Sequence, residues 1–168
     1  MIITLTYQPD KGVSFDETIL LSGTDRRQIR TLLNDKFKIG DNVVDLSKYN
    51  NGDTSQNIVQ RRDIYKNYKG QNNFFFLNFD TNERLKEVEL HYGLRIKIKD
   101  VNILFSMNIE KVAQLLDIVS NEKKQLSEGE YFYKNLKLTI ASSKAVGGDG
   151  NKLSYFYCSK DVTHLMEE

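Results

Sequence analysis

Two heptapeptides of this chain share the tripeptide Tyr-Lys-Asn: RDIYKNY at Arg62–Tyr68 and EYFYKNL at Glu130–Leu136. The second tripeptide follows the first by 68 residues, and the same distance separates Leu85 from Leu153 further along the chain. A constant offset between matched segments indicates an internal repeat, and two copies of one unit form a pseudo-symmetric domain rather than a solenoid. We therefore predict a single domain over residues 1–168, built by internal duplication.

The order of predicted elements supports this division. Residues 12–93 and 94–161 each begin with β-rich sequence, continue into a short amphipathic helix and end in a hairpin. Leu33 in the first helix matches Leu116 in the second at an offset of 83, which exceeds 68 by 15 residues. The surplus lies in the polar segment 38–61, which has no sustained apolar period and which we interpret as a long exposed loop inserted in the first copy.

The predicted fold class is α+β, with one or two antiparallel sheets and two amphipathic helices, built from two strand-helix-strand-strand units. Helices are expected within 22–37 and 106–124, and strands at 2–7, 13–21, 72–79, 85–92, 94–105, 131–144 and 152–159. The residues expected in the core are Phe74, Phe76, Val88, Leu90, Ile96, Ile98, Ile103, Leu115, Leu138, Ile140 and Phe156.

Composition restricts the class of protein further. Lys and Arg together number 24 and Asp and Glu 23, so the net charge of +1 gives no global field that attracts nucleic acid or an anionic membrane. The single cysteine excludes an internal disulfide, and the amino-terminal sequence lacks the plan of a secretory signal. No apolar run approaches the ~20 residues of a membrane-spanning helix. We expect a soluble cytoplasmic protein.

Residues with catalytic or metal-binding chemistry are few. Neither His91 nor His164 has a Cys, His or Asp partner at a metal-ligand spacing, so no metal site is predicted. Cys158 is expected to be a small apolar core residue, while a Cys158 nucleophile beside a histidine is a third functional alternative. The glycines in residues 147–151 precede a strand, so they indicate a turn rather than a phosphate cradle.

Two strand segments carry alternating charges. Glu87 and Glu89 alternate with apolar residues, which predicts a solvated sheet face or the rim of a partner site. Arg95, Lys97 and Lys99 alternate in the same way and form the alternative site, a nucleic-acid-binding strand face with aromatic neighbours for base stacking. The nearby glutamates and the balanced net charge weigh against nucleic acid as a partner.

The segment FFFLNFDTNERLKEVELHYGLRIKIKDVNILF and the helix after it, over Phe74–Leu116, resemble small cytosolic immunity proteins of bacterial polymorphic and contact-dependent toxin systems. The resemblance implies a non-enzymatic protein that binds a toxin domain tightly and blocks its active site or displaces its substrate. No cofactor is expected. In the polar loop, Asp41, Asp45 and Asp53 offer carboxylates to a basic cleft, and Tyr49 offers an aromatic anchor. These four residues are the predicted partner-binding site.

Overall fold

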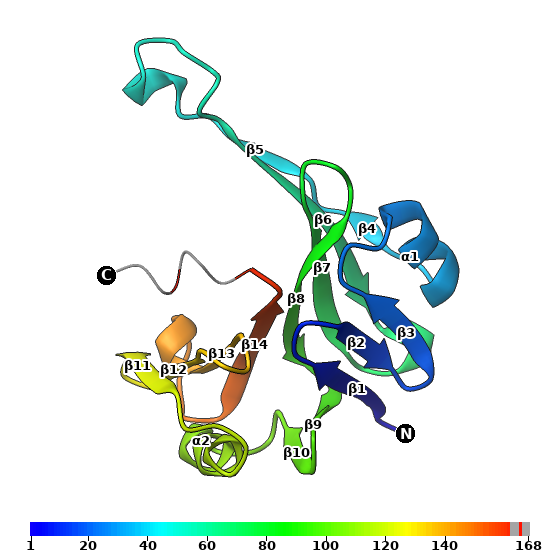
Figure 1. Ribbon diagram of the computed structural model, residues 1–168, viewed down its shortest axis with the longest axis vertical. Helices are drawn as coiled ribbons and strands as arrows, with labels where there is room; N and C mark the ends of the chain where they lie inside the picture. The colour runs from blue at the N-terminus through cyan, green and yellow to red at the C-terminus, as the bar shows by residue number, and fades with distance from the viewer. Residues whose placement is uncertain (162–164, 166–168) are drawn as a thin grey trace.

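The computed structural model describes residues 1–161 and Leu165. Over these residues the chain forms two stacked β-sheets with two α-helices at their edges (Figure 1). The smaller sheet has the strand order β10-β9-β1-β2-β3. Its strands are β1 (Ile3–Gln8), β2 (Gly12–Phe15), β3 (Thr18–Leu21), β9 (Leu94–Ile98) and β10 (Val101–Leu104).

The larger sheet has the strand order β11-β12-β13-β14-β8-β7-β6-β4, and β5 pairs with β6 beyond this path. All of its pairs are antiparallel, whereas β1 and β9 of the smaller sheet are parallel. Its strands are β4 (Lys38–Ile39), β5 (Asn42–Val44), β6 (Ile58–Lys66), β7 (Phe74–Phe79), β8 (Leu85–Tyr92), β11 (Lys123–Ser127), β12 (Glu130–Tyr133), β13 (Leu138–Ser142) and β14 (Leu153–Ser159). The predicted α+β class is confirmed.

The two helices are α1 (Arg26–Leu33) and α2 (Ile109–Asp117), each packed beside an edge strand of the smaller sheet. The side chains of Asp25 and Asn108 cap them by accepting hydrogen bonds from backbone N–H groups of the first turn. Both helices are shorter than predicted, because Asn34 ends α1 in the left-handed conformation and the lysines at 123–124 begin β11 instead of ending α2. Within the described residues, no helix has the length and apolar character needed to span a membrane.

Three predicted strands are in fact hairpins. Segment 13–21 turns at Asp16, segment 94–105 turns at Lys99, and segment 131–144 turns between β12 and β13 at residues 134–137. Asp16 and Lys99 adopt positive φ angles of 51° and 52°, which permit a tight reversal. Apolar alternation continues on both sides of such a turn, so the hydrophobic pattern alone does not reveal it.

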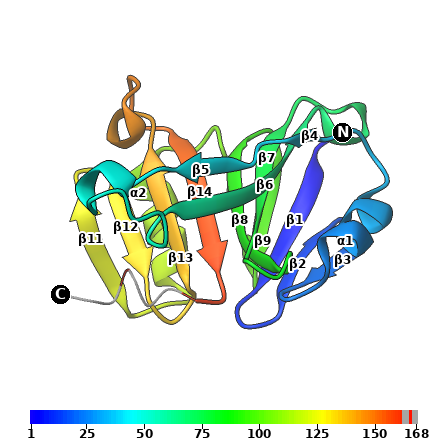
Figure 2. The same cartoon turned by 90° about the horizontal axis from the view of Figure 1, so that it is seen from above.

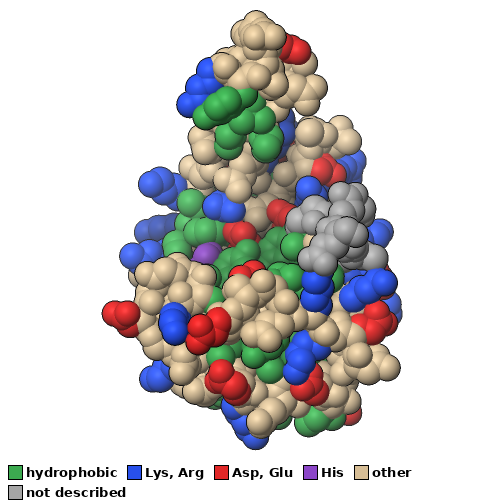
Figure 3. Space-filling model, turned by 90° about the vertical axis from the view of Figure 1, so that its left-hand side faces the viewer, with side chains coloured by type: hydrophobic (Ala, Val, Ile, Leu, Met, Phe, Trp, Pro, Cys, Tyr) green, Lys and Arg blue, Asp and Glu red, His purple; other side chains and the backbone are tan. Residues whose placement is uncertain are grey.

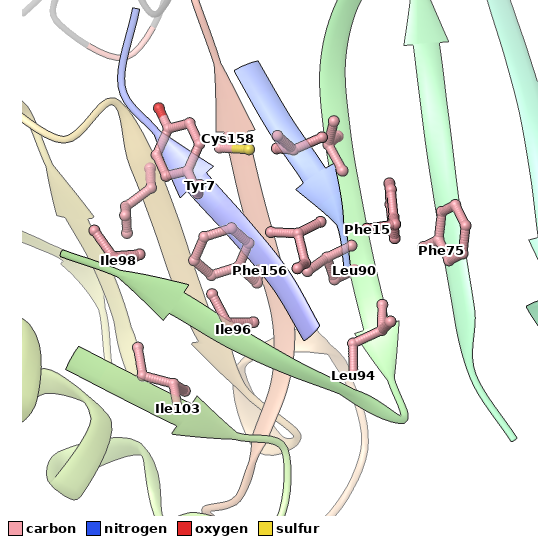
Figure 4. Close-up of a cluster of buried hydrophobic side chains, with 14 of the residues drawn as sticks. Tyr7, Phe15, Phe75, Leu90, Leu94, Ile96, Ile98, Ile103, Phe156 and Cys158 are labelled. Carbon is pink, nitrogen blue, oxygen red and sulfur yellow. The ribbon is translucent and has the colours of Figure 1, made fainter. Parts of the chain in front are cut away.

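The core lies between the facing apolar sides of the two sheets (Figure 4). A fully buried Leu, Ile or Phe side chain stabilises the fold by about 1.5–3 kcal/mol relative to an exposed one, so this layer supplies the main favourable free energy. The predicted core residues that are buried are Val88, Leu90, Ile96, Ile98, Ile103, Leu138, Ile140 and Phe156.

The prediction was wrong for Phe74, Phe76 and Leu115. Phe75 is fully buried and stacks on Phe15 with a ring-centroid distance of 4.5 Å, whereas Phe74 and Phe76 lie half-buried on the opposite face of β7. Three consecutive phenylalanines carry no alternation, and a shift of one residue exchanges the two faces of a strand. Leu115 is half-buried and packs against the edge of the core.

Segment 38–61 is not a structureless loop. It forms β4, β5, the 3-10 turn η1 (Ser47–Tyr49) and the first part of β6. We call residues 42–60 the arm, because this two-stranded ribbon projects from the body of the molecule (Figure 1). Seen from above, β5 and β6 cross in front of strands of the larger sheet (Figure 2). The other 3-10 turns are η2 (Tyr68–Gly70) and η3 (Lys144–Val146).

Candidate functional site

The outer face of the larger sheet, opposite the core, carries an unusual set of polar and aromatic side chains. Alternation along the strands brings residues from β6, β7, β8 and β14 to this face. On the side of the molecule seen in Figure 3, hydrophobic, histidine and acidic side chains gather below the arm. The polar and aromatic residues that form the network at its centre are Arg62, Asn78, Glu87, Glu89, Tyr155 and Tyr157.

Glu89 is the central carboxylate that forms a salt bridge with Arg62. Its Oε2 accepts a hydrogen bond of 2.8 Å from Nη2 of Arg62, and its Oε1 accepts one of 2.9 Å from the hydroxyl of Tyr155. Burial, and then the charge of Glu89, raises the pKa of Tyr155. The phenol therefore stays protonated at neutral pH and remains a donor to Glu89.

Glu87 accepts side-chain hydrogen bonds from two neutral donors of the neighbouring strands. Its Oε1 accepts a hydrogen bond of 3.3 Å from Nδ2 of Asn78, and its Oε2 accepts one from the hydroxyl of Tyr157. Glu87 and Glu89 are both half-buried, so the expectation of a solvated sheet face was wrong. The sequence pattern did not reveal that tyrosines of β14 lie beside both carboxylates.

A cavity of about 230 Å³ opens next to this network, and we call it the hollow. It is smaller than the roughly 300–1,000 Å³ of pockets for drug-sized ligands, so it suits a side chain or small group rather than a large cofactor. It is lined by Gln60, Arg62, Asn78, Glu87, Glu89, Leu126, Glu130, Thr139, Tyr155, Tyr157 and Leu165.

His91 lies on the same face, beside the network but outside the lining of the hollow. Its ring centroid is 4.5 Å from that of Phe76, 5.4 Å from that of Phe74 and 5.8 Å from that of Tyr155. Burial lowers the pKa of His91, and its buried Nε2 has no hydrogen-bond partner among the described residues. The imidazole is therefore neutral at pH 7 and packs as an aromatic ring.

A buried ion-pair network fixes the base of the arm. The Asp63 carboxylate is fully buried and accepts hydrogen bonds of 2.6 Å from Nη2 of Arg26 and 2.7 Å from Nε of Arg30. Arg26 also donates to Asp41 at 2.7 Å and to Glu83 at 3.0 Å. These contacts join α1, the residue before β5, β6 and the β7–β8 turn at the base of the arm.

The four predicted partner-binding residues occupy different environments. Asp41 lies at the base of the arm, where the hydrogen bond from Arg26 lowers the pKa of its carboxyl. Asp45, Tyr49 and Asp53 lie in the tip between β5 and β6. Asp45 and Asp53 accept hydrogen bonds from the backbone N–H groups of Ser47 and Ser55 respectively. Tyr49 is 73% exposed. Asp45, Tyr49 and Asp53 are thus on the projecting surface, whereas Asp41 is engaged within the molecule.

The alternative basic face lies on the smaller sheet. Arg95 and Lys97 point outward from β9, and Lys99 occupies the β9–β10 turn. Glu87 and Glu89 belong to the other sheet, so they do not offset this charge as expected from the sequence. None of the outward side chains of the neighbouring strands carries an aromatic ring on which a base can stack. They are Thr4, Thr6, Gln8, Ser14, Ile19, Leu21, Asn102 and Leu104.

Cys158 points into the core, where it pairs across the sheet with Val88 and is 3% exposed. Burial raises the pKa of its thiol, which disfavours the nucleophilic thiolate. His91 lies on the opposite face of the same sheet, so these two residues do not form a catalytic pair. His164 lies outside the described residues.

Several residues of this face were not predicted from the sequence: Arg62, Asn78, Thr139, Tyr155 and Tyr157. One signal was available for the tyrosines, because they alternate with the apolar core residues of β14 and must share the outer face. Among the residues that the structure describes, no three His, Cys, Asp or Glu side chains converge as a set of metal ligands. Compared with protein-family models, curated proteins and solved structures, the chain matches none of them.

Proposed function

We propose that the protein is a non-enzymatic binding module that holds a protein partner against the arm and the adjacent outer face of the larger sheet. The observation that carries this proposal is the exposure of apolar side chains on both faces of the arm. Val43 lies opposite Val59 on one face, and Val44 lies opposite Ile58 on the other. The exposed fractions range from 43% for Val44 to 57% for Ile58.

A two-stranded ribbon is at best marginally stable in water without further packing, and contiguous exposed apolar surface is typical of interaction sites. Burying such surface against a partner is favourable by about 25 cal/mol for each Å² of apolar area removed from water. The ion pairs of Asp63 and Arg26 already fix the base of the arm. Binding of a partner therefore immobilises fewer residues of the arm than it would of a free loop.

The proposed partner is a bacterial toxin domain with a basic cleft, and the proposed compartment is the bacterial cytoplasm. This identification rests on the resemblance to immunity proteins and on the charge of the arm tip. Hydrogen bonds from Ser47 and Ser55 lower the pKa values of Asp45 and Asp53 respectively, so both carboxylates are ionised at neutral pH. Exposed anionic groups beside an aromatic anchor suit a cationic partner surface.

We also propose that the two halves of the chain arose from one unit. The N-cap residues take part in equivalent bridges, Asp25 with Arg84 and Asn108 with Lys152. These pairs are related by the same two offsets as the sequence repeat, because 108 − 25 is 83 and 152 − 84 is 68. The side chains of Tyr65 and Tyr133 are both fully buried, which is the equivalence that the repeat requires.

Each half contains three neighbouring antiparallel strands, β6-β7-β8 in the first and β12-β13-β14 in the second. The middle strand of each set departs from the offset of 68. Tyr65 pairs with Phe75, and Tyr133 pairs with Leu138, so β7 and β13 are related by 138 − 75, or 63 residues. The first copy has a longer connection between these strands, which contains η2. On this proposal, insertions lie in the connections and in the arm, while the paired strands keep their order.

The proposal requires a toxin gene beside the gene of this protein, and its test measures by calorimetry the affinity of the chain for the toxin domain of that neighbouring gene. A variant with Val43→Ser, Tyr49→Ala and Val59→Ser should bind at least about 100-fold more weakly, because it removes a central aromatic and two apolar contacts. The matched control is Ile19→Ser with Leu21→Ser, which alters exposed apolar residues on the smaller sheet. Failure of the unmodified protein to bind, or equal binding by the arm variant with an unchanged melting temperature, would contradict the proposal.

A further inference from the structure

We propose that the hollow binds a guanidinium group, namely an arginine side chain of the protein partner. This inference deepens the proposed function and rests on it for the identity of the partner, but the binding chemistry is carried by separate residues. None of the arm-tip residues lines the hollow.

The charge balance of the hollow favours a cation. Its described lining contains one cationic side chain, Arg62, and three carboxylates, Glu87, Glu89 and Glu130. Arg62 forms its salt bridge with Glu89, at 2.8 Å. Glu87 receives hydrogen bonds from the neutral donors Asn78 and Tyr157, and within the described part of the chain no cationic side chain pairs with it. Each carboxylate oxygen has two acceptor positions, so Glu87 retains capacity for a charged donor.

An unpartnered buried hydroxyl is the second, independent indication of a ligand. Thr139 lines the hollow and is 5% exposed. Its hydroxyl oxygen, Oγ1, has no hydrogen-bond partner among the described residues. Leaving such a group unsatisfied destabilises the fold, so buried hydroxyls normally have a partner. A ligand N–H group in the hollow would supply one. Thr139 and Glu87 then act as two acceptors in the same cavity.

The aromatic wall favours a planar cation over a compact ammonium. The rings of Tyr155 and Tyr157 are nearly parallel, with an interplanar angle of 10° and a centroid distance of 6.4 Å. A guanidinium is planar, carries five N–H donors and stacks on aromatic faces, whereas a lysine ammonium is a strongly hydrated point charge. Leu126, also in the lining, provides apolar contact for the methylene stem of an arginine.

The position of the hollow favours an arginine from a macromolecule. Gln60 of β6 belongs both to the arm and to the lining of the hollow, so one partner surface can cover the apolar arm and insert a side chain beside it. The volume of about 230 Å³ accommodates a side chain, while the acidic lining opposes phosphate and other anions.

The test is an NMR titration of the isotope-labelled full chain with the peptide acetyl-Gly-Arg-Gly-amide. The neutral isostere with citrulline in place of arginine is the ligand control, and a lysine peptide tests the preference for a planar cation. The arginine peptide should shift the amide signals of Glu87, Glu89 and residues 155–157, and it should bind at least about tenfold more tightly than the citrulline peptide. Equal binding of arginine and citrulline peptides, or shifts elsewhere only, would overturn the inference.

Variants refine the same measurement. Glu87→Gln should weaken binding of the arginine peptide at least about tenfold, whereas Glu17→Gln, the same charge change at an exposed turn of the smaller sheet, should change it less than about twofold. Thr139→Val should weaken binding without altering charge. If Glu87→Gln does not fold, the comparison of arginine with citrulline on the unmodified protein still decides the question.

The arm variant separates this inference from the proposed function. It should bind the arginine peptide normally, because its substituted residues do not line the hollow. If the arm variant no longer binds the toxin domain but still binds the arginine peptide, the result supports both the proposed function and the guanidinium site. Selective peptide binding by a protein that captures no toxin domain would refute the proposed function and leave the guanidinium site intact.

Discussion

At the scale of single residues, the most demanding position is Asp63. A buried carboxylate is tolerated only when it is paired and hydrogen-bonded, and Asp63 accepts four hydrogen bonds from Arg26 and Arg30. The two arginines are one helical turn apart, so both reach β6 from the same face of α1. Asp63 thereby positions the helix against the strand that continues into the arm.

We predict that Asp63→Asn lowers the free energy of unfolding by about 3–5 kcal/mol, because it removes the carboxylate that pairs with Arg30 and the buried one of the three that pair with Arg26. Urea denaturation at pH 7 measures the change. Asp149→Asn, at an exposed position in the turn before β14, is the matched control and should change the free energy by less than about 0.5 kcal/mol. Similar values for the two variants would show that the ion-pair network does not stabilise the fold.

At the scale of elements, the connection between β8 and β9 carries the chain from the larger sheet to the smaller one in a single residue, Gly93. Its φ angle is +80°, and a Cβ atom there would lie 1.9 Å from the backbone oxygen of Asn72. Both the conformation and the close approach require glycine. The predicted boundary between the two halves lies at this residue, and the structure supplies the steric reason for glycine there.

Gly93→Ala should therefore be much more destabilising than Gly150→Ala. Gly150 has a similar φ of +95°, but no heavy atom lies within 4 Å of the position that a Cβ would take, so alanine there costs only the backbone strain of about 1–2 kcal/mol. The clash at Gly93 adds about 3 kcal/mol or more, because backbone atoms must move. Thermal and urea denaturation of both variants measures the difference, and equal destabilisation would contradict this account.

At the scale of the whole molecule, the two sheets are joined by a core to which distant segments contribute. β1 lies between β9 and β2 in the smaller sheet, and β14 lies beside β8 in the larger one. Residues of β1 and of both predicted halves of the chain therefore share one apolar layer, which includes Tyr7, Leu90, Ile96, Phe156 and Cys158 (Figure 4). Neither half contains a complete core of its own.

This arrangement predicts that Cys158 reacts only when the whole domain opens. Labelling of the native protein with iodoacetamide should be slower than labelling of the unfolded chain by a factor near the unfolding equilibrium constant, about 10³–10⁸ for typical domains. A Gln56→Cys substitution in the Cys158→Ser background places a thiol in the exposed arm tip. This thiol should be labelled in the native protein about as fast as in the unfolded chain. Rapid labelling of Cys158 in the native protein would show that the sheets separate locally.

Local pattern was sufficient for the parts of the fold that depend on neighbours in the chain. Periodicity is a local property, and it was enough to predict the α+β class, the two helices and the inward residues of β8. It also located the segment that forms the arm. It did not reveal the turns at Asp16 and Lys99, where alternation continues through the reversal.

Contacts between distant segments determine which face of β7 is buried and which polar residues meet on the outer face of the larger sheet. Phe75 is inside and Phe76 outside because the smaller sheet covers one face and not the other, a choice that three consecutive phenylalanines leave open. Glu87 and Tyr157 are 70 residues apart in the chain and share a hydrogen bond through the pairing of β8 with β14. Pairings of that kind depend on the register of distant strands, and that register is fixed when the two sheets close on their common core.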